Sequence, residues 1–202
     1  MTRRTLILAC CASLVVAGCQ RSVDGASAPA AGFESLPLTV QDVREISGFD
    51  GFARVADDDR IVPDTATPEG PCRALFDQGV AFGDNRVDIR TVEDEGDLDA
   101  GNPAPLITSA IQTVVTYADR DRARDAFDRR LENMTDCAAL RLDFMDGVVS
   151  QPDPTTVAYV HDEWALVSAV RSSVVVDVSV TVLPDAEQIA SEMTARILDR
   201  ID

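Results

Sequence analysis

The stretch WALVSAVRSSVVVDVSVTV, residues 164–182, has the strongest strand pattern in the chain. Its second half places a valine at every other position from Val174 to Val182, with Val175, Asp177, Ser179 and Thr181 between them. Such alternation is typical of a strand with one buried face. Residues 164–171 alternate in the same way, and Ser172 and Ser173 lie between the two runs. The pattern predicts an antiparallel hairpin that turns at these two serines.

Other strands are predicted outward from this hairpin. Residues 107–117 place Ile107, Ile111, Val115 and Tyr117 on one face, together with Ser109 and Thr113. Residues 157–161 and 87–92 carry shorter strand patterns. Residues 93–105 are acidic and contain Gly and Pro, so we expect them to form a loop. Residues 50–62 show no clear periodicity, with an acidic turn at positions 57–59.

Helices are predicted between and after these strands. Thr39 and Asp42 form a helix-capping pair, and Gly48 is a typical stop. Asp119 caps a second helix, and Pro184 starts a third. Their inner stripes are Ala123, Phe127, Leu131 and Met134 in the former and Ile189, Met193, Ile197 and Ile201 in the latter. Strand hairpins with helices between and after them predict an α+β fold, with a mostly antiparallel sheet and packed helices in one domain, residues 36–202.

The N-terminal residues predict where in the cell the protein is located. Arg3 and Arg4 precede an uncharged run, residues 5–18, which is shorter than the roughly 20 residues of a spanning helix. The run ends in Val16-Ala17-Gly18-Cys19, which resembles the lipobox of bacterial lipoproteins. That resemblance implies a signal peptide at residues 1–18 and lipidation of Cys19, followed by a flexible Ala-, Ser- and Gly-rich tether at residues 19–35. The alternative is an ordinary signal peptide followed by a coincidental cysteine. With the lipobox, we expect the protein on the extracytoplasmic face of the cell membrane, held by lipid.

Charge and cysteine content narrow the possible partners. The formal net charge is −17 and lysine is absent, which argues against nucleic acid and against docking on anionic lipid. If Cys19 carries lipid and residues 1–18 are removed, Cys72 and Cys137 are the remaining cysteines. In an oxidising compartment they are expected to form a disulfide, with two unrelated buried thiols as the alternative. A zinc site is not expected, because two cysteines and one distant histidine lack ligand clustering, and we expect no other cofactor.

Catalytic motifs are weak. His161 is the single histidine, and no nucleophile elbow of the G-x-S-x-G type accompanies it. The acidic run at residues 93–99 offers oxygen ligands for Ca²⁺, yet the position of the bidentate Glu of an EF-hand falls on Thr108, so we expect a solvated loop. A glycosidase needs two carboxylates, and no pair among the 35 acidic residues is singled out.

The order of these parts resembles a known family. The segment LPLTVQDVREISGF, then CRALF, then ITSAIQTVVTYADRDRARDAFDRRLENMTDC, then the hairpin and last helix, is similar to PknH-like extracellular sensor domains. These form the outer part of certain mycobacterial Ser/Thr kinases and also occur as free-standing lipoproteins. The resemblance implies an antiparallel sheet with packed helices, a Cys72–Cys137 bridge, and a cleft for an extracellular ligand without catalysis.

We therefore expect a membrane-tethered, non-catalytic ligand-binding or sensor-like lipoprotein, working with an unknown envelope ligand and with a membrane signalling partner. Tyr117, Trp164 and Asp177 are the candidate ligand residues, because an aromatic pair and a lone acid on one sheet face suit an amphipathic ligand. Two alternatives remain open: an envelope hydrolase that uses acidic residues, and a structural lipoprotein without a ligand.

Overall fold

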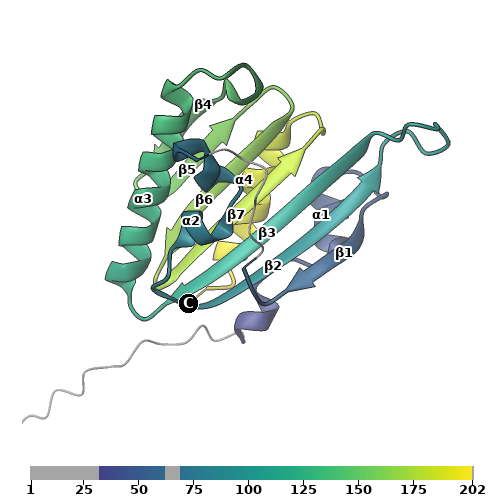
Figure 1. The fold of residues 1–202 in the computed structure, drawn as a ribbon. Coiled ribbons are helices and arrows are strands. Elements are labelled where there is room, and N and C mark those ends of the chain that lie inside the picture. The colour runs from purple at the N-terminus through teal and green to yellow at the C-terminus, as the bar shows by residue number, and fades with distance from the viewer. Residues whose placement is uncertain (1–31, 62–68, 202) are drawn as a thin grey trace, which may run out of the picture.

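A computed structural model describes residues 32–61 and 69–201, and in this part of the chain seven strands form one antiparallel sheet. The strand order is β1-β2-β3-β7-β6-β5-β4, so the hairpin of residues 164–182 lies near the middle (Figure 1). The strands are β1 (Ala53–Asp58), β2 (Arg86–Asp97), β3 (Ile107–Tyr117), β4 (Val148–Asp153), β5 (Thr156–Val160), β6 (Trp164–Arg171) and β7 (Val174–Thr181). The predicted α+β class, with a mostly antiparallel sheet in a single domain, is confirmed.

The central hairpin forms as its pattern predicts. β6 and β7 pair from Trp164 opposite Thr181 to Arg171 opposite Val174. Ser172 adopts a positive φ of 53°, the left-handed conformation that tight hairpin turns require. Within this register Asp177 lies between Ser168 of β6 and Thr113 of β3. The alternation of residues 164–182 therefore places one acidic side chain on the middle of the sheet.

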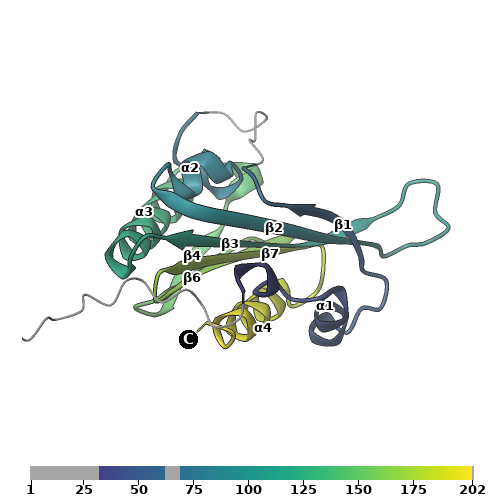
Figure 2. The same ribbon diagram turned by 90° about the horizontal axis from the view of Figure 1, so that it is seen from below.

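Helices cover both faces of the sheet. They are α1 (Val40–Ser47), α2 (Gln78–Phe82), α3 (Arg120–Ala139) and α4 (Ala186–Leu198), with short 3-10 turns η1 (Phe33–Ser35), η2 (Pro71–Leu75) and η3 (Asp143–Met145). Figure 2 shows α2 and α3 on one face, and α1 and α4 on the other. Each face has its own hydrophobic core, one around Phe127 and Met134 of α3, the other around Met193 and Ile197 of α4.

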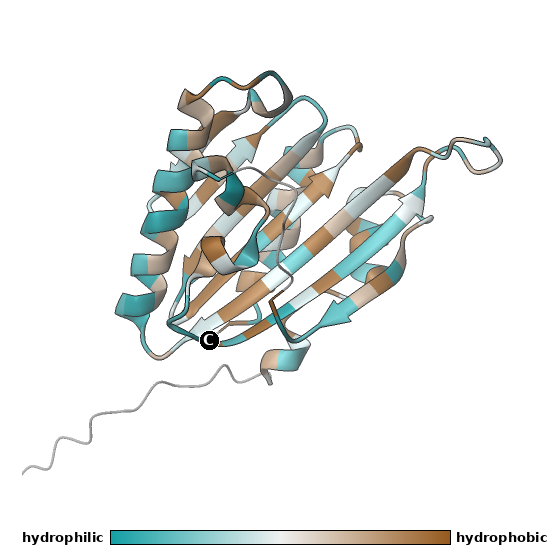
Figure 3. Cartoon of the chain, in the orientation of Figure 1, coloured by the Kyte–Doolittle hydropathy of each residue, from teal (hydrophilic) through white to brown (hydrophobic). Residues whose placement is uncertain are grey.

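Two of the three predicted helix starts are confirmed, and the third helix begins two residues later than predicted. Thr39 and Asp42 form a reciprocal capping box, and Gly48 ends α1 in the left-handed conformation. Asp119 caps α3 by accepting from the amide of Arg122. The last helix starts two residues after Pro184, with Asp185 at its N-cap, and Ile201 is buried just beyond its end. In Figure 3 α3 carries wide hydrophilic bands, as a helix with one outer face should.

The sheet is larger than the sequence predicted. β2 extends through Glu93 and Glu95 to Asp97, so the expectation that residues 93–105 are a loop was wrong for its first part. β1 and β4 were not predicted, and neither was the five-residue helix α2. Both missed strands are edge strands that bury few side chains, which removes the apolar alternation that marks a strand. The acidic part of β2 is held by neighbours on β1 and β3, which a local pattern does not show.

A disulfide joins Cys72 of η2 to Cys137 near the end of α3, with the two Cα atoms 4.7 Å apart. The predicted pairing is confirmed. Because the bond crosses 65 residues of sequence, it ties η2 and the following α2 to the long helix. These two short elements thereby form a lid over part of the α3 face, visible in front of β6 and β7 in Figure 1.

Several N-terminal predictions lie outside the described residues: the signal peptide at residues 1–18, the lipidated Cys19, and most of the tether at residues 19–35. The last tether residues, Phe33–Ser35, form η1, and Phe33 packs against the α4 core. Within residues 32–61 and 69–201 no helix combines the length and apolarity needed to cross a membrane.

Candidate functional site

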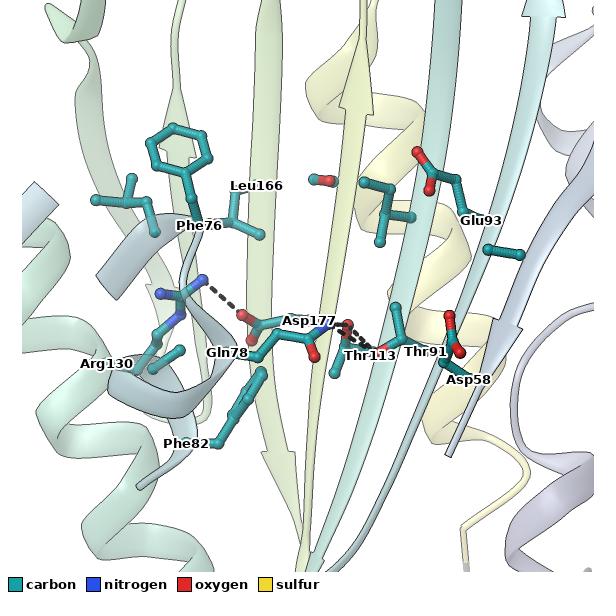
Figure 4. A pocket seen from close by; sticks show the side chains of 15 residues that line it. Asp58, Phe76, Gln78, Phe82, Thr91, Glu93, Thr113, Arg130, Leu166 and Asp177 are labelled. Atoms are coloured by element: carbon teal, nitrogen blue, oxygen red, sulfur yellow. Dashed lines mark hydrogen bonds and ion pairs between the residues drawn. The ribbon is translucent and has the colours of Figure 1, made fainter. Parts of the chain in front are cut away.

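A cavity of about 420 Å³ lies on the α3 face of the sheet, beneath η2 and α2. Strands β1, β2, β3, β6 and β7 supply its floor, and α3 contributes one side chain, Arg130. Figure 4 shows how its lining is divided. Phe76, Phe82 and Leu166 lie toward one side, Asp58 and Glu93 lie toward the other, and polar side chains lie between them.

A buried ion pair forms the centre of this lining. Nη2 of Arg130 lies 2.6 Å from Oδ2 of Asp177, and only 2% of Arg130 and 5% of Asp177 are exposed. Nη1 of Arg130 donates to the carbonyl oxygen of Ala74 in the lid, and the guanidinium lies 6.0 Å from the ring centre of Phe82. The pair therefore joins α3, the sheet and the lid at one point.

This ion pair is incompletely satisfied. Three buried polar atoms lack a hydrogen-bond partner among the described residues: Nε of Arg130, Oδ1 of Asp177 and Oγ of Ser168, which lies opposite Asp177 on β6. Buried polar groups are nearly always paired, because an unmade hydrogen bond costs about 1–3 kcal/mol. Two of these atoms belong to residues that line the cavity. The cavity therefore lies beside a buried ion pair that has unused hydrogen-bonding capacity.

A small polar network continues the floor toward β2. Nε2 of Gln78 donates to the hydroxyl of Thr91 at 2.8 Å and approaches that of Thr113 at 3.4 Å. The two hydroxyl oxygens lie 3.2 Å apart. Gln78 is the first residue of α2, and Asp77 caps that helix. This network fixes the lid to β2 and β3 and leaves hydroxyl groups at the cavity.

The far side of the cavity is acidic. Asp58 at the end of β1 and Glu93 of β2 both line it. Burial raises the pKa of Glu93 above its ordinary value, and the neighbouring charges of Glu95 and Asp94 raise it further. Asp58 has one distant ion pair, with Arg60 at 3.8 Å, and Arg60 is highly exposed. Among the described residues, Glu93 forms no ion pair, and the charges that act on its pKa are those of Glu95 and Asp94.

The opposite wall is aromatic and connects to a stack. Phe76 is 42% exposed although it lines the cavity, and its ring meets that of Trp164 edge-on at 5.7 Å. Trp164 in turn stacks on Tyr159 at 5.3 Å and on His161 at 5.6 Å. An exposed phenylalanine at a cavity mouth offers an apolar contact for a ligand.

The three predicted ligand residues share the α3 face but do not form one site. Asp177 lines the cavity, whereas Trp164 reaches it only through Phe76. Tyr117 is buried in the core, where its hydroxyl donates to the carbonyl of Phe82 at 3.0 Å. Burial and then the charge of Asp177 raise the pKa of this hydroxyl. Their roles as ligand residues therefore remain predictions, and the structure favours Asp177.

Arg130 is the residue that the sequence reading missed. The inner stripe of α3 was assigned to Leu131, but Leu131 is half-buried and Arg130 is the buried side chain at this turn. Positions 123, 127, 130 and 134 are spaced by three and four residues, so the helical period itself pointed to position 130. An arginine on an otherwise apolar stripe was the available signal for a buried ion pair.

The other candidate sites do not assemble. Within the described ranges, no group of three or more acidic, histidine or cysteine side chains is placed to hold a metal ion. In the acidic run that was weighed against a Ca²⁺ site, Oδ1 of Asp97 accepts from the amide of Asp99, and Oδ2 of Asp99 accepts from the side chain of Asn102. His161 stacks on Trp164, and its Nδ1 accepts from the amide of Glu163.

Comparisons with known proteins agree with this architecture. The sequence model of the PknH-like extracellular domain family matches residues 28–200. Among solved structures, the extracellular domain of PknH from Mycobacterium tuberculosis superposes with a TM-score of 0.65 at 18% sequence identity. The alignment covers 82% of this chain and 92% of that domain. At this identity the likeness shows the fold. A search of curated proteins finds no match.

Proposed function

This chain belongs to the family of PknH-like extracellular domains, and from that premise we propose that it is a non-catalytic, sensor-like binding module. In this proposal a lipid on Cys19 tethers the protein to the outer side of the cell membrane. The cavity beneath the lid receives a small amphipathic ligand from the envelope. A membrane protein that contacts the domain passes the signal on.

The cavity and its ion pair carry the ligand-binding part of the proposal. A pair that is this deeply buried is a weak source of stability, because desolvation offsets most of the attraction between the charges. Here the pair also leaves Oδ1 of Asp177 and Nε of Arg130 without partners beside a cavity of about 420 Å³. A structural ion pair gains nothing from spare hydrogen-bonding atoms, whereas a binding site needs them.

Native mass spectrometry of the protein purified from its own membrane tests this part. We expect a bound small molecule that is lost when Ile111→Trp fills the cavity from its half-buried edge. Val148→Trp is the matched control, because Val148 is exposed on the opposite edge strand and does not line this cavity. A wild-type protein that never retains a small molecule would support the structural lipoprotein instead.

The tether rests on residues 1–19, where a positive start and a short apolar run precede Val16-Ala17-Gly18-Cys19. We expect the processed protein to begin at a lipid-modified Cys19, detectable by mass spectrometry of its N-terminal peptide. Cys19→Ser should move the protein out of the membrane fraction, whereas Cys11→Ser within the apolar run should leave it there. Recovery of the Cys19→Ser protein in the membrane at wild-type levels would contradict the anchor.

The last part of the proposal is that the protein does not catalyse a reaction. An acid hydrolase on this scaffold would use Glu93 and Asp58, the cavity carboxylates outside the Arg130 ion pair. We expect no turnover of envelope glycans by the wild-type protein. Turnover that disappears in Glu93→Gln would replace the binding proposal with the hydrolase.

A further inference from the structure

We propose that the cavity selects amphipathic cations, meaning molecules that place an amine beside an aromatic or aliphatic group, over neutral and anionic molecules of the same shape. This inference rests on the proposed binding function and adds the chemical class of the ligand. It follows from the distribution of charges, acceptors and apolar side chains around the cavity.

The charge of the lining is negative. Among the described residues that line it, Asp58, Glu93 and Asp177 are the carboxylates and Arg130 is the cation. The charge of Arg130 is already balanced by Asp177 and its guanidinium is almost completely buried, so it offers little to an anionic ligand. The charges that face an incoming molecule are those of Asp58 and Glu93. Arg60 lies 3.8 Å from Asp58, but it is so exposed that solvent screens it.

An independent observation concerns hydrogen bonding. Asp177 lines the cavity and is 95% buried, and its charged acceptor Oδ1 has no donor among the described residues. Such an atom calls for an N–H or O–H group. An amine supplies donors and positive charge together, whereas a carboxylate supplies neither. Glu93 points to the same chemistry, because it lines the cavity together with Asp58. Burial, with the nearby charges of Glu95 and Asp94, raises the pKa of Glu93, so a cation beside it would relieve this repulsion.

One wall of the cavity is apolar and can contact the apolar part of the ligand. Phe76, which lies between η2 and α2, and Leu166 of β6 line the cavity opposite the acids (Figure 4). Leu75 of η2 also belongs to the lining. Because Phe76 remains 42% exposed, a ligand that covers its ring gains apolar burial without any rearrangement of the core. An amine with an attached ring or chain spans from this wall to Asp58 and Glu93.

Three probes with the same ring test the inference: 2-phenylethylamine, 2-phenylethanol and 3-phenylpropanoate. Binding to the full chain in nanodiscs of uncharged lipid is followed by calorimetry and by the fluorescence of Trp164, the chain's single tryptophan, which contacts Phe76. We expect the amine to bind at least about tenfold more tightly than the alcohol, and the carboxylate to bind most weakly. Asp58→Asn combined with Glu93→Gln should remove the preference for the amine.

Asp88→Asn is the control, because it removes an acidic charge from the same strand, β2, at an exposed position outside this cavity. It should keep the preference. Equal affinities for amine and alcohol, with the tryptophan response still lost in Ile111→Trp, would overturn the charge inference and leave the binding function standing. Failure of all three probes, together with no retained molecule in native mass spectrometry, would overturn both.

Discussion

Two ion pairs, each with a buried aspartate, lie on opposite faces of the sheet, and they differ in how completely their hydrogen-bonding atoms are paired. Asp94 of β2 lies on the α4 face, and both of its oxygens accept from Arg54, at 2.7 and 3.2 Å. Arg54 also donates to the carbonyl oxygen of Leu38. Both carboxylate oxygens of Asp94 therefore have a hydrogen-bond partner. On the α3 face, Asp177 and Arg130 share one contact of 2.6 Å, and each keeps an atom without a partner.

This difference suggests that the α4 face mainly stabilises the fold, whereas the α3 face is suited to binding a ligand. The α4 face packs valines and isoleucines against Met193 and Ile197, and its ion pair fixes the edge strand β1. The α3 face keeps a cavity, needs a disulfide to secure its lid, and places an incomplete ion pair at the cavity. Groups that a fold leaves incomplete at a cavity are expected where stability has been given up for binding.

Breaking the Arg130 pair on one side should have the largest effect. We expect Arg130→Met to lower the free energy of unfolding by about 3–5 kcal/mol, because Asp177 is left buried and uncompensated. Replacing both residues, Arg130→Met with Asp177→Leu, should recover most of this stability and abolish ligand retention. The double replacement Arg54→Met with Asp94→Leu should keep retention. Urea unfolding and native mass spectrometry measure both, and retention in the Arg130 double variant would contradict the contrast.

Removing the disulfide should come next. Replacing Cys72 and Cys137 with serine should cost about 4 kcal/mol on the chain-entropy account of a 65-residue loop. Hydrogen exchange should then rise mainly in η2 and α2, while α4 keeps its protection because it packs in the other hydrophobic core and does not depend on the disulfide. Equal loss of protection on both faces would show that the lid is not a separate unit.

A matched pair of isoleucines compares the packing of the two faces. Ile197→Ala removes a fully buried side chain on the α4 face and should cost about 2–5 kcal/mol. Ile111→Ala, at the half-buried edge of the cavity, should cost less than half of that value, because less burial and packing are lost. Denaturant midpoints measure both. Similar losses would mean that the cavity is filled in solution.

The smallest expected effect on stability concerns Glu93, on the acidic side of the cavity. Because burial raises the pKa of Glu93 in the folded state, folding favours its protonated form. Its contribution to stability is therefore present below its ordinary pKa of 4.5 and is lost as the pH rises through the raised value. Glu93→Gln should slightly raise stability at pH 7 and should not do so at pH 4. Urea unfolding at these two pH values checks the sign, and a lower stability at pH 7 would show that ionised Glu93 has a cationic partner.

Much of the fold could be predicted because its signals are local. The valine alternation of residues 174–182 and the capping box at Thr39 and Asp42 depend on spacing and residue type alone. The pairing of Cys72 with Cys137 followed from the cysteine count and the family resemblance. The edge strands and the acidic half of β2 could not be read in the same way. Their stability comes from cross-strand neighbours such as Arg54, which are distant in the sequence.

The candidate site was predicted only in part for the same reason. Asp177 stood out as the single acid among alternating valines, and the structure places it at the cavity. The sequence by itself determined the central hairpin, the helix caps, the cysteine pair and the likeness to a family, since each is carried by a short period or a fixed order of parts. Only the tertiary structure decided that Arg130 meets Asp177, that Tyr117 belongs to the core, and that Asp58 and Glu93 face a shared cavity. Contacts between residues tens of positions apart depend on how helices and strands pack, and a local pattern does not contain that information.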